Sequence, residues 1–228
     1  MRNIKGPVYE LGVYVKDTNK ENGPGHVSSF VRKTENGKSK TTHTSFFPGA
    51  LGSLINGLTL GSIPVKGMLA QNHENDHEEA EHVLVKQISR EEYLLAKAAH
   101  QEFKEEVETG HRTYAVFGSL NPVASFATTL MSASINAHLT AKQHKEHHSF
   151  HAHEAFCGIH VYDNEAHVNI KSIDVDNCTT SVTHILTKTG IGFENPRVPT
   201  FFTSELQKHG FKKVSKEELE VSRVLNQS

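Results

Sequence analysis

The sequence predicts an α+β fold, and three features of the chain support this class. Residues 7–47 hold segments rich in β-branched and aromatic residues, with turn residues between them. Ser89 and Glu92 form a capping-box pattern that opens a helical segment. Residues 178–190 carry apolar side chains at helical spacing. Strands at the start of the chain, followed by helices and shorter strands, are typical of this class.

Three strands are expected in the N-terminal part, at residues 7–16, 26–32 and 41–47. Asn36-Gly37 is typical of a two-residue hairpin turn, which favours antiparallel pairing of the second and third strands. Side chains alternate between the faces of a strand, so His43 and Ser45 are expected on the same face of the third one.

The segment that follows is glycine-rich and apolar. Gly52, Gly57, Gly61 and Pro64 weaken a continuous helix, and we expect a packed loop over residues 49–70. Its composition also allows contact with a membrane surface. A histidine tract at residues 73–82 is interleaved with acidic residues and is expected to be a solvated loop.

The rest of the chain alternates between helices and short strands. Capping residues, apolar spacing and turn residues predict, in order, a strand at 83–88, a helix from Ser89 to about Val107, a strand at 114–117, a helix at 124–139, a hairpin at 157–173, a helix at 178–190 and a short helix at 205–209 capped by Ser204.

Composition narrows the classes of function. The formal net charge is −2, so general attraction to nucleic acid is not expected. The N-terminus lacks the apolar core of a signal peptide, and no stretch is apolar enough to span a bilayer. Two cysteines, Cys157 and Cys178, are too few for a disulfide framework. We expect a cytoplasmic protein, or one exported without an N-terminal signal peptide.

Cys178 lies where a helix is expected to begin. Asp176 and Asn177 are good N-cap residues, and Gly190 is a good residue to end the helix. In the first turn, unpaired backbone N–H groups and the helix dipole stabilise a thiolate and can also bind an oxyanion. Cys178 is therefore a candidate nucleophile, although a lone cysteine beside a helix is more often an inert small apolar residue.

Histidine is unusually frequent, with 17 residues, many of them in the tract at 73–82 and a second tract at 144–153. His73 and His77 would share a helix face, and neutral imidazoles bind zinc or nickel. The interleaved charged residues equally suit solvated loops, so no metal ligands and no cofactor are assigned.

Several short motifs, in a shared order, resemble the circularly permuted papain-like cysteine hydrolases, the NlpC-type branch that includes lecithin-retinol-acyltransferase-like proteins. Gly25-His26 opens a strand, residues 44–48 end another in Ser, two Phe and Pro, and Asn177-Cys178 opens a helix. The resemblance covers about half of the chain. It implies one domain over residues 1–228, with insertions around 49–82 and 119–173 and an antiparallel sheet packed against the cysteine-bearing helix.

The resemblance also implies roles for individual residues. Cys178 would be the nucleophile and His26 the base, with a third polar residue on the next strand orienting the imidazole. Of the two candidates on that strand, His43 is favoured over Ser45. The chain would be a thiol hydrolase that cleaves amide, isopeptide or ester bonds through an acyl-thioester on Cys178, or an acyltransferase when another nucleophile replaces water. Its substrate would be a protein, a peptide or an acyl ester.

Two alternatives follow from the same sequence. The histidine tracts could make the protein a metal-binding one, and a papain-like scaffold could serve as a non-catalytic interaction module, since a fold does not determine a function. Substitution of Cys178 by alanine separates these classes because it abolishes only the hydrolase.

Overall fold

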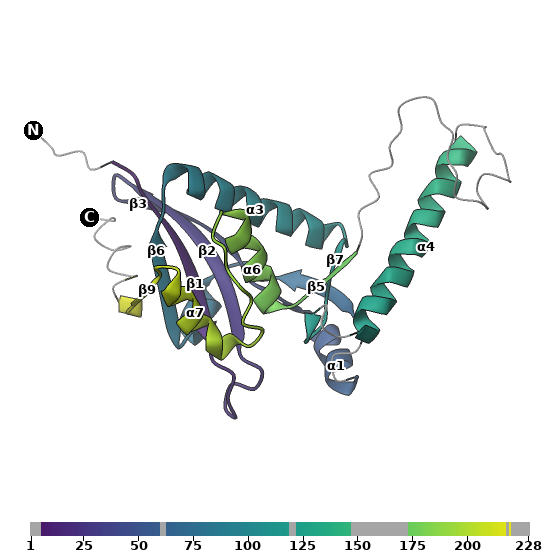
Figure 1. Ribbon diagram of the computed structural model, residues 1–228, viewed down its shortest axis with the longest axis horizontal. Coiled ribbons are helices and arrows are strands. Elements are labelled where there is room, and N and C mark those ends of the chain that lie inside the picture. The colour runs from purple at the N-terminus through teal and green to yellow at the C-terminus, as the bar shows by residue number, and fades with distance from the viewer. Residues whose placement is uncertain (1–5, 60–62, 119–121, 147–172, 218, 220–228) are drawn as a thin grey trace, which may run out of the picture.

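The computed structural model describes residues 6–59, 63–118, 122–146, 173–217 and 219, and it has a mixed α+β architecture (Figure 1). The strands are β1 (Val8–Lys16), β2 (His26–Glu35), β3 (Lys38–Thr44), β4 (Phe46–Pro48), β5 (Val65–Leu69), β6 (His82–Gln87), β7 (Arg112–Tyr114), β8 (Asp174–Asp176) and β9 (Lys212–Val214). The helices are α1 (Ala50–Leu58), α2 (Glu74–Glu79), α3 (Arg90–Glu108), α4 (Pro122–Glu146), α6 (Cys178–Lys188) and α7 (Phe202–Lys208), with a 3₁₀ turn, η2, at Pro199–Phe201. The predicted α+β class is confirmed.

The larger sheet is antiparallel, with the strand order β3-β2-β1-β6-β9. The β2–β3 turn has positive φ at both central residues, 48° at Asn36 and 78° at Gly37. This is the geometry of a type I′ turn, whose twist matches that of the flanking strands. The predicted hairpin at this position is confirmed.

The smaller sheet has the order β4-β5-β7-β8, with β7 and β8 parallel and the other pairs antiparallel. The strand expected over residues 41–47 is divided between the two sheets. Thr44 is the last residue of β3, Phe46 is the first of β4, and Ser45 lies at the crossing point. This change of sheet decides which side chains reach His26.

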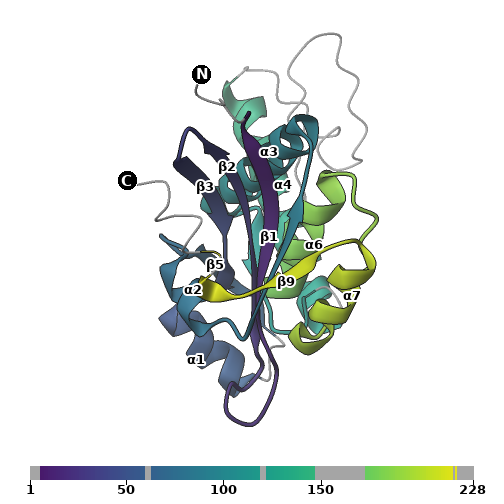
Figure 2. The same ribbon diagram turned by 90° about the vertical axis from the view of Figure 1, so that its left-hand side faces the viewer.

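One face of the larger sheet carries the main core. Helices α3, α6 and α7 cover this face (Figures 1 and 2). Apolar side chains from β1, β2 and β6 meet those of the three helices in one cluster that includes Val13, Val27, Leu84, Ala96, Val182, Leu186, Phe202 and Leu206. Cys178 belongs to this cluster, so the core itself positions the start of α6 against β2.

The prediction of a packed loop over residues 49–70 is wrong, because the segment forms α1 and β5. A Cβ atom at Gly52 would lie 2.9 Å from the side chain of Val65. The glycine therefore allows the helix to pack closely on β5, and this packing offsets the low helix propensity of glycine. Apolar side chains also remain exposed on α1, Leu54 by 60% and Leu58 by 78%.

Further predictions need correction or lie outside the described residues. The strand expected at 114–117 overlaps β7 only at Tyr114, because β7 spans Arg112–Tyr114. The first histidine tract, expected as a solvated loop, contains α2, and His77 in it is buried. The last predicted helix begins at Phe202, so Ser204 lies inside α7 and does not cap it. The hairpin expected at 157–173 falls almost entirely outside the described residues. In contrast, α3 begins with the predicted capping box of Ser89 and Glu92.

Candidate active site

Cys178 is the first residue of α6, as predicted, and Asn177 is the N-cap. The Asn177 side chain accepts a hydrogen bond from the Thr180 N–H at 2.9 Å, and the Thr180 hydroxyl accepts one from the Asn177 N–H at 2.8 Å. The Asn177 amide also donates to the carbonyl of Val116 at 2.9 Å, which ties the start of α6 to the segment after β7. These bonds fix the position of the thiol, which is buried and 7% exposed.

His26 is the first residue of β2 and is placed by a tight turn. Gly25 has φ +69°, and a Cβ atom there would lie 2.6 Å from the Lys16 carbonyl oxygen. Only glycine fits this conformation and this close approach, so the turn that places His26 requires glycine at position 25. The His26 side chain is 26% exposed. The structure therefore brings the imidazole to the edge of the core, within hydrogen-bond reach of Cys178.

The thiol and the imidazole shift each other's protonation in opposite directions. Burial would lower the pKa of His26, but the hydrogen bond and the charge interaction with Cys178, together with the charge of Asp76, raise it. Burial would raise the pKa of the Cys178 thiol, but the hydrogen bond and charge of His26 lower it, as do backbone N–H groups of Val27 and Thr179. Both shifts favour a thiolate–imidazolium pair.

The ring nitrogen Nε2 of His26 has two oxygen partners. Ser45 Oγ lies 2.8 Å away and is within hydrogen-bond distance. Asp76 Oδ1 lies 4.0 Å away, at the distance of an ion pair with a protonated ring. Ser45 is 2% exposed, so its hydroxyl is held in the protein interior. Ser45, the second candidate for orienting the ring, thus lies directly on it.

His43, the favoured orienting residue, takes a different place. Its Nε2 lies 2.8 Å from Asp76 Oδ2 and 3.3 Å from Ser28 Oγ. In the β2–β3 register His43 is opposite Phe30, which is four residues along β2 from His26. The backbone positions of the two histidines are therefore about 13 Å apart along the strand direction. The polypeptide crosses between sheets just beyond, which brings Ser45 back to the start of β2. Strand alternation alone could not predict this crossing.

Asp76 joins the two histidines and was not singled out from the sequence. Burial would raise its pKa, but hydrogen bonds from His43 and Ser28 and the charge of His26 lower it to about 2. The carboxylate is therefore charged at neutral pH. Asp76 lies on α2, in the histidine tract expected to be a solvated loop. Because its role depends on how α2 folds back over β1, no local motif in the sequence indicates it.

A small polar cavity of about 110 Å³ opens beside this group. His26, Ser28 and Asp76 line one part of it, and an ion pair between Lys16 and Glu79 at 2.8 Å lies at another. Tyr114 of β7 lies close enough to the thiol to be affected by its charge. Burial raises the pKa of its hydroxyl, and so does the negative charge of Cys178. The tyrosine thus stays protonated and can donate a hydrogen bond.

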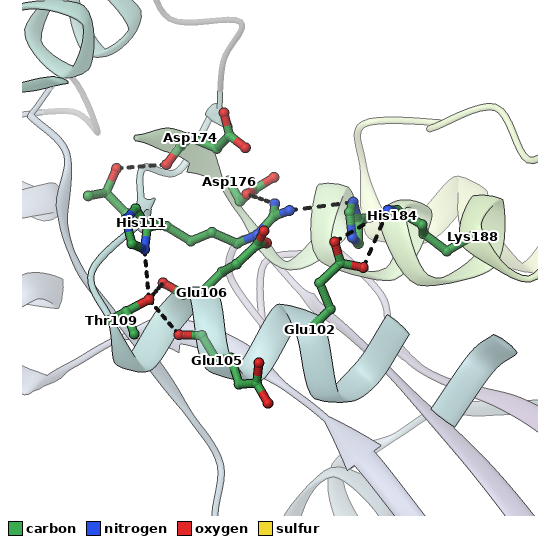
Figure 3. Close-up of polar contacts among 11 residues, drawn as sticks. Glu102, Glu105, Glu106, Thr109, His111, Asp174, Asp176, His184 and Lys188 are labelled. Atoms are coloured by element: carbon green, nitrogen blue, oxygen red, sulfur yellow. Dashed lines mark hydrogen bonds and ion pairs between the residues drawn. The ribbon is translucent and has the colours of Figure 1, made fainter. Parts of the chain in front are cut away.

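A second polar network links α6 and the residues just before it to the neighbouring elements (Figure 3). The buried Arg112 on β7 donates to Asp176 of β8 and, at 2.6 Å, to Glu106 of α3. It also lies 3.5 Å from the His184 ring on α6. Asp176 comes two residues before Cys178. The network therefore joins β7, β8, α3 and α6 just behind the candidate nucleophile.

The histidine tracts also suggested the hypothesis of a metal-binding protein. Within the described ranges, no group of three or more His, Cys, Asp or Glu side chains is arranged to hold a metal ion. Residues 147–153 of the second histidine tract lie outside those ranges, as does Cys157.

Comparisons with family models, with characterised proteins and with solved structures found no match to this chain. Among the described helices, none has the length and apolar character needed to cross a bilayer.

Proposed function

We propose that the protein is a thiol hydrolase in which Cys178 is the nucleophile and His26 is the general base. The proposal is carried by the placement of the Cys178 thiol at the N-terminus of α6 beside the His26 imidazole, whose interaction with the thiol lowers the thiol pKa. The two residues are far apart in the sequence and belong to different elements. A buried cysteine that serves only as a packing residue needs neither an imidazole partner nor a lowered pKa.

The proposed reaction begins with attack of the Cys178 thiolate on the carbonyl carbon of an amide, isopeptide or ester. The positive end of the α6 helix dipole, where Cys178 lies, stabilises the resulting oxyanion, and Tyr114 can add a hydroxyl donor. The C–N or C–O bond then breaks, and the leaving group takes a proton from the His26 imidazolium. This leaves an acyl-thioester on Cys178.

His26 next removes a proton from water, whose oxygen attacks the thioester and releases the carboxylic acid and the free thiol. An amine or alcohol that attacks in place of water makes the same chemistry an acyl transfer. We propose a protein, a peptide or an acyl ester as substrate. The reaction needs a free thiol, which suits a reducing compartment such as the cytoplasm.

Ser45 and Asp76 act on the imidazole in this proposal. When Nε2–H donates to Ser45, Nδ1 is left to exchange a proton with the thiol. Asp76, at 4.0 Å, stabilises the imidazolium that forms during the reaction. His43 supports this arrangement indirectly, because it holds the other oxygen of Asp76.

The resemblance to permuted papain-like hydrolases remains part of the proposal. The histidine-bearing strand β2 precedes the cysteine-bearing helix α6, and α6 packs on the face of an antiparallel sheet. This order and packing support the resemblance, and residues 49–82 and 119–173 would be insertions in a single domain.

The test is labelling by an acyl-type activity probe that forms a thioester or thioether only with an activated thiolate. Wild-type protein should be labelled at Cys178 near neutral pH. His26→Ala should lose most of the labelling, whereas His82→Ala should not. His82 is a suitable control because it also opens a strand, is 24% exposed and lies 3.3 Å from a carboxylate, that of Asp17. Equal labelling of wild type and His26→Ala would refute the proposal in favour of a non-catalytic module.

A further inference from the structure

Exposed apolar side chains gather on one part of the molecule. They belong to α1, to β5 and the residues just before it, to the segment after β7 and to α4, and they are Leu54, Leu58, Ile63, Met68, Phe117, Val123, Phe126, Leu130 and Met131, each at least 45% exposed. The large apolar residues exposed elsewhere in the described part are Val8, Leu94, Leu95 and Phe201. We call the first group the apolar end. A patch of this kind on a protein surface usually marks a contact site.

Both segments of the apolar end lie at the same end of the long axis. Helix α1 packs on β4 and β5, and α4 contacts β8, so both are carried by the smaller sheet. Figure 1 shows α4 projecting from the body at this end, where α1 also lies. Two segments about 60 residues apart in the sequence thus bring exposed apolar side chains to the same end of the molecule.

Long stretches of sequence around this surface carry no charged residue, although Lys66 of β5 is exposed and α4 ends with Lys142, Lys145 and Glu146. No Asp, Glu, Lys or Arg occurs between Lys40 and Lys66, or between Arg112 and Lys142, in a chain that is 22% charged. A projecting helix in water normally has a charged or strongly polar face. Placing a charge in the hydrocarbon region of a bilayer is costly, so a surface that enters lipid must lack charge.

Three threonine hydroxyl groups on these helices and at their ends are hydrogen-bonded to carbonyls of the same helix. Thr128 donates to the Ala124 carbonyl at 3.1 Å, and Thr129, although exposed, donates to the Ser125 carbonyl at 2.9 Å. In α1 and its cap, Thr59 donates to the Ile55 carbonyl at 2.8 Å. Hydroxyls bonded back to their own helix need no water, which is how Ser and Thr are accommodated in lipid.

We propose that the apolar end is a lipid-contact surface, by which the protein rests on an electrically neutral bilayer interface. Helix α1 has nine residues and is about 14 Å long, too short to cross a hydrocarbon core of about 30 Å. The contact is therefore peripheral, with Leu and Phe side chains inserted among the acyl chains. It does not depend on the proposed thiol chemistry.

The low charge of this surface predicts which lipids it binds. Many peripheral proteins bind anionic lipid through Lys and Arg, and salt weakens that binding. Here the contact is apolar and the net charge of the chain is −2, so anionic lipid should add nothing. Binding to phosphatidylcholine vesicles should be unchanged between about 0.1 M and 0.5 M salt.

The experiment is vesicle flotation with phosphatidylcholine alone, using the full chain. Wild type should float with the vesicles. Phe126→Ser/Leu130→Ser and Leu54→Ser/Leu58→Ser should each weaken binding by about tenfold or more, because each loses two inserted side chains. Leu94→Ser/Leu95→Ser is the matched control, since these leucines of α3 are 52% and 51% exposed and lie outside the apolar end. The control should float like wild type.

Several results would overturn the proposal. If wild type stays in solution and light scattering shows a dimer that either double variant dissociates, the surface joins two copies of this chain and does not bind lipid. An equal loss in the control, or flotation that requires anionic lipid and disappears in salt, would also contradict a neutral lipid contact. Circular dichroism of each variant separates loss of the surface from loss of the fold.

Discussion

At the scale of single residues, the thiol and the imidazole share one proton, and this makes their reactivity dependent on pH. The His26 hydrogen bond and charge lower the pKa of Cys178 against the effect of burial. We expect the alkylation rate of Cys178 to rise at a lower pH than that of an ordinary thiol, whose pKa is about 8.5. In His26→Ala only burial and the helix remain, so the rise should move to higher pH. Iodoacetamide kinetics followed by peptide mass spectrometry measure this, and an unshifted profile would contradict the pairing.

We predict different effects on Cys178 reactivity from substitution of Ser45 and of His43. Ser45 contacts the His26 ring directly, so Ser45→Ala should slow Cys178 alkylation at neutral pH by about tenfold, the equivalent of one lost hydrogen bond. His43→Ala acts only through Asp76 and should cost less than about threefold. The same kinetics measure both variants. The reverse order would return the orienting role to His43.

Asp76 makes a prediction about stability in acid. Its pKa is lowered from 3.8 to about 2, so its stabilising interactions are fully present above about pH 4 and are lost as the pH falls towards 2. The loss should be about 2 kcal/mol in the free energy of unfolding. Asp76→Asn should lack this step, whereas Glu74→Gln on the same helix should keep it. Urea titrations at pH 4 and pH 2 give the comparison.

At the scale of elements, the anchorage of α6 depends on a buried cation. Arg112 contacts Glu106, Asp176 and the Phe103 ring. Arg112→Met would leave the buried Asp176 and the partly buried Glu106 without a counter-ion and should destabilise the protein by about 3 kcal/mol. Lys188→Met, which removes the exposed pair with Glu102, should cost less than about 0.5 kcal/mol. Chemical denaturation measures both, and similar losses would contradict the role given to Arg112.

The elements also show what the sequence could predict. Local signals were sufficient for α3, with its capping box, for the Asn36-Gly37 hairpin and for the start of α6, because each depends on neighbouring residues. They were insufficient for α1, whose glycine is explained only by the packing of Gly52 on Val65. They also failed at Ser45 and Asp76, since a change of sheet and a folded-back helix are long-range events.

At the scale of the whole molecule, α3 connects the two sheets. Tyr93 and Ala96, near its start, lie in the core of the larger sheet, and Phe103 and Val107, near its end, lie in that of the smaller one. We expect a single cooperative unfolding transition. The accessibility of Cys178 to a thiol reagent and the circular dichroism signal should change at the same urea concentration. Exposure of the thiol at a lower concentration would show that the sheets unfold separately.

The order of His26 and Cys178 along the chain has a consequence for synthesis. A ribosome makes β1 and β2 first, and these strands can pair as a hairpin while the rest of the chain is still unmade. The growing polypeptide therefore carries the proposed base, His26, long before the proposed nucleophile, Cys178. The two side chains can meet only after β8 has joined β7 and α6 has docked on β2, so we expect the proposed chemistry to be silent during translation and to begin with the completion of the core.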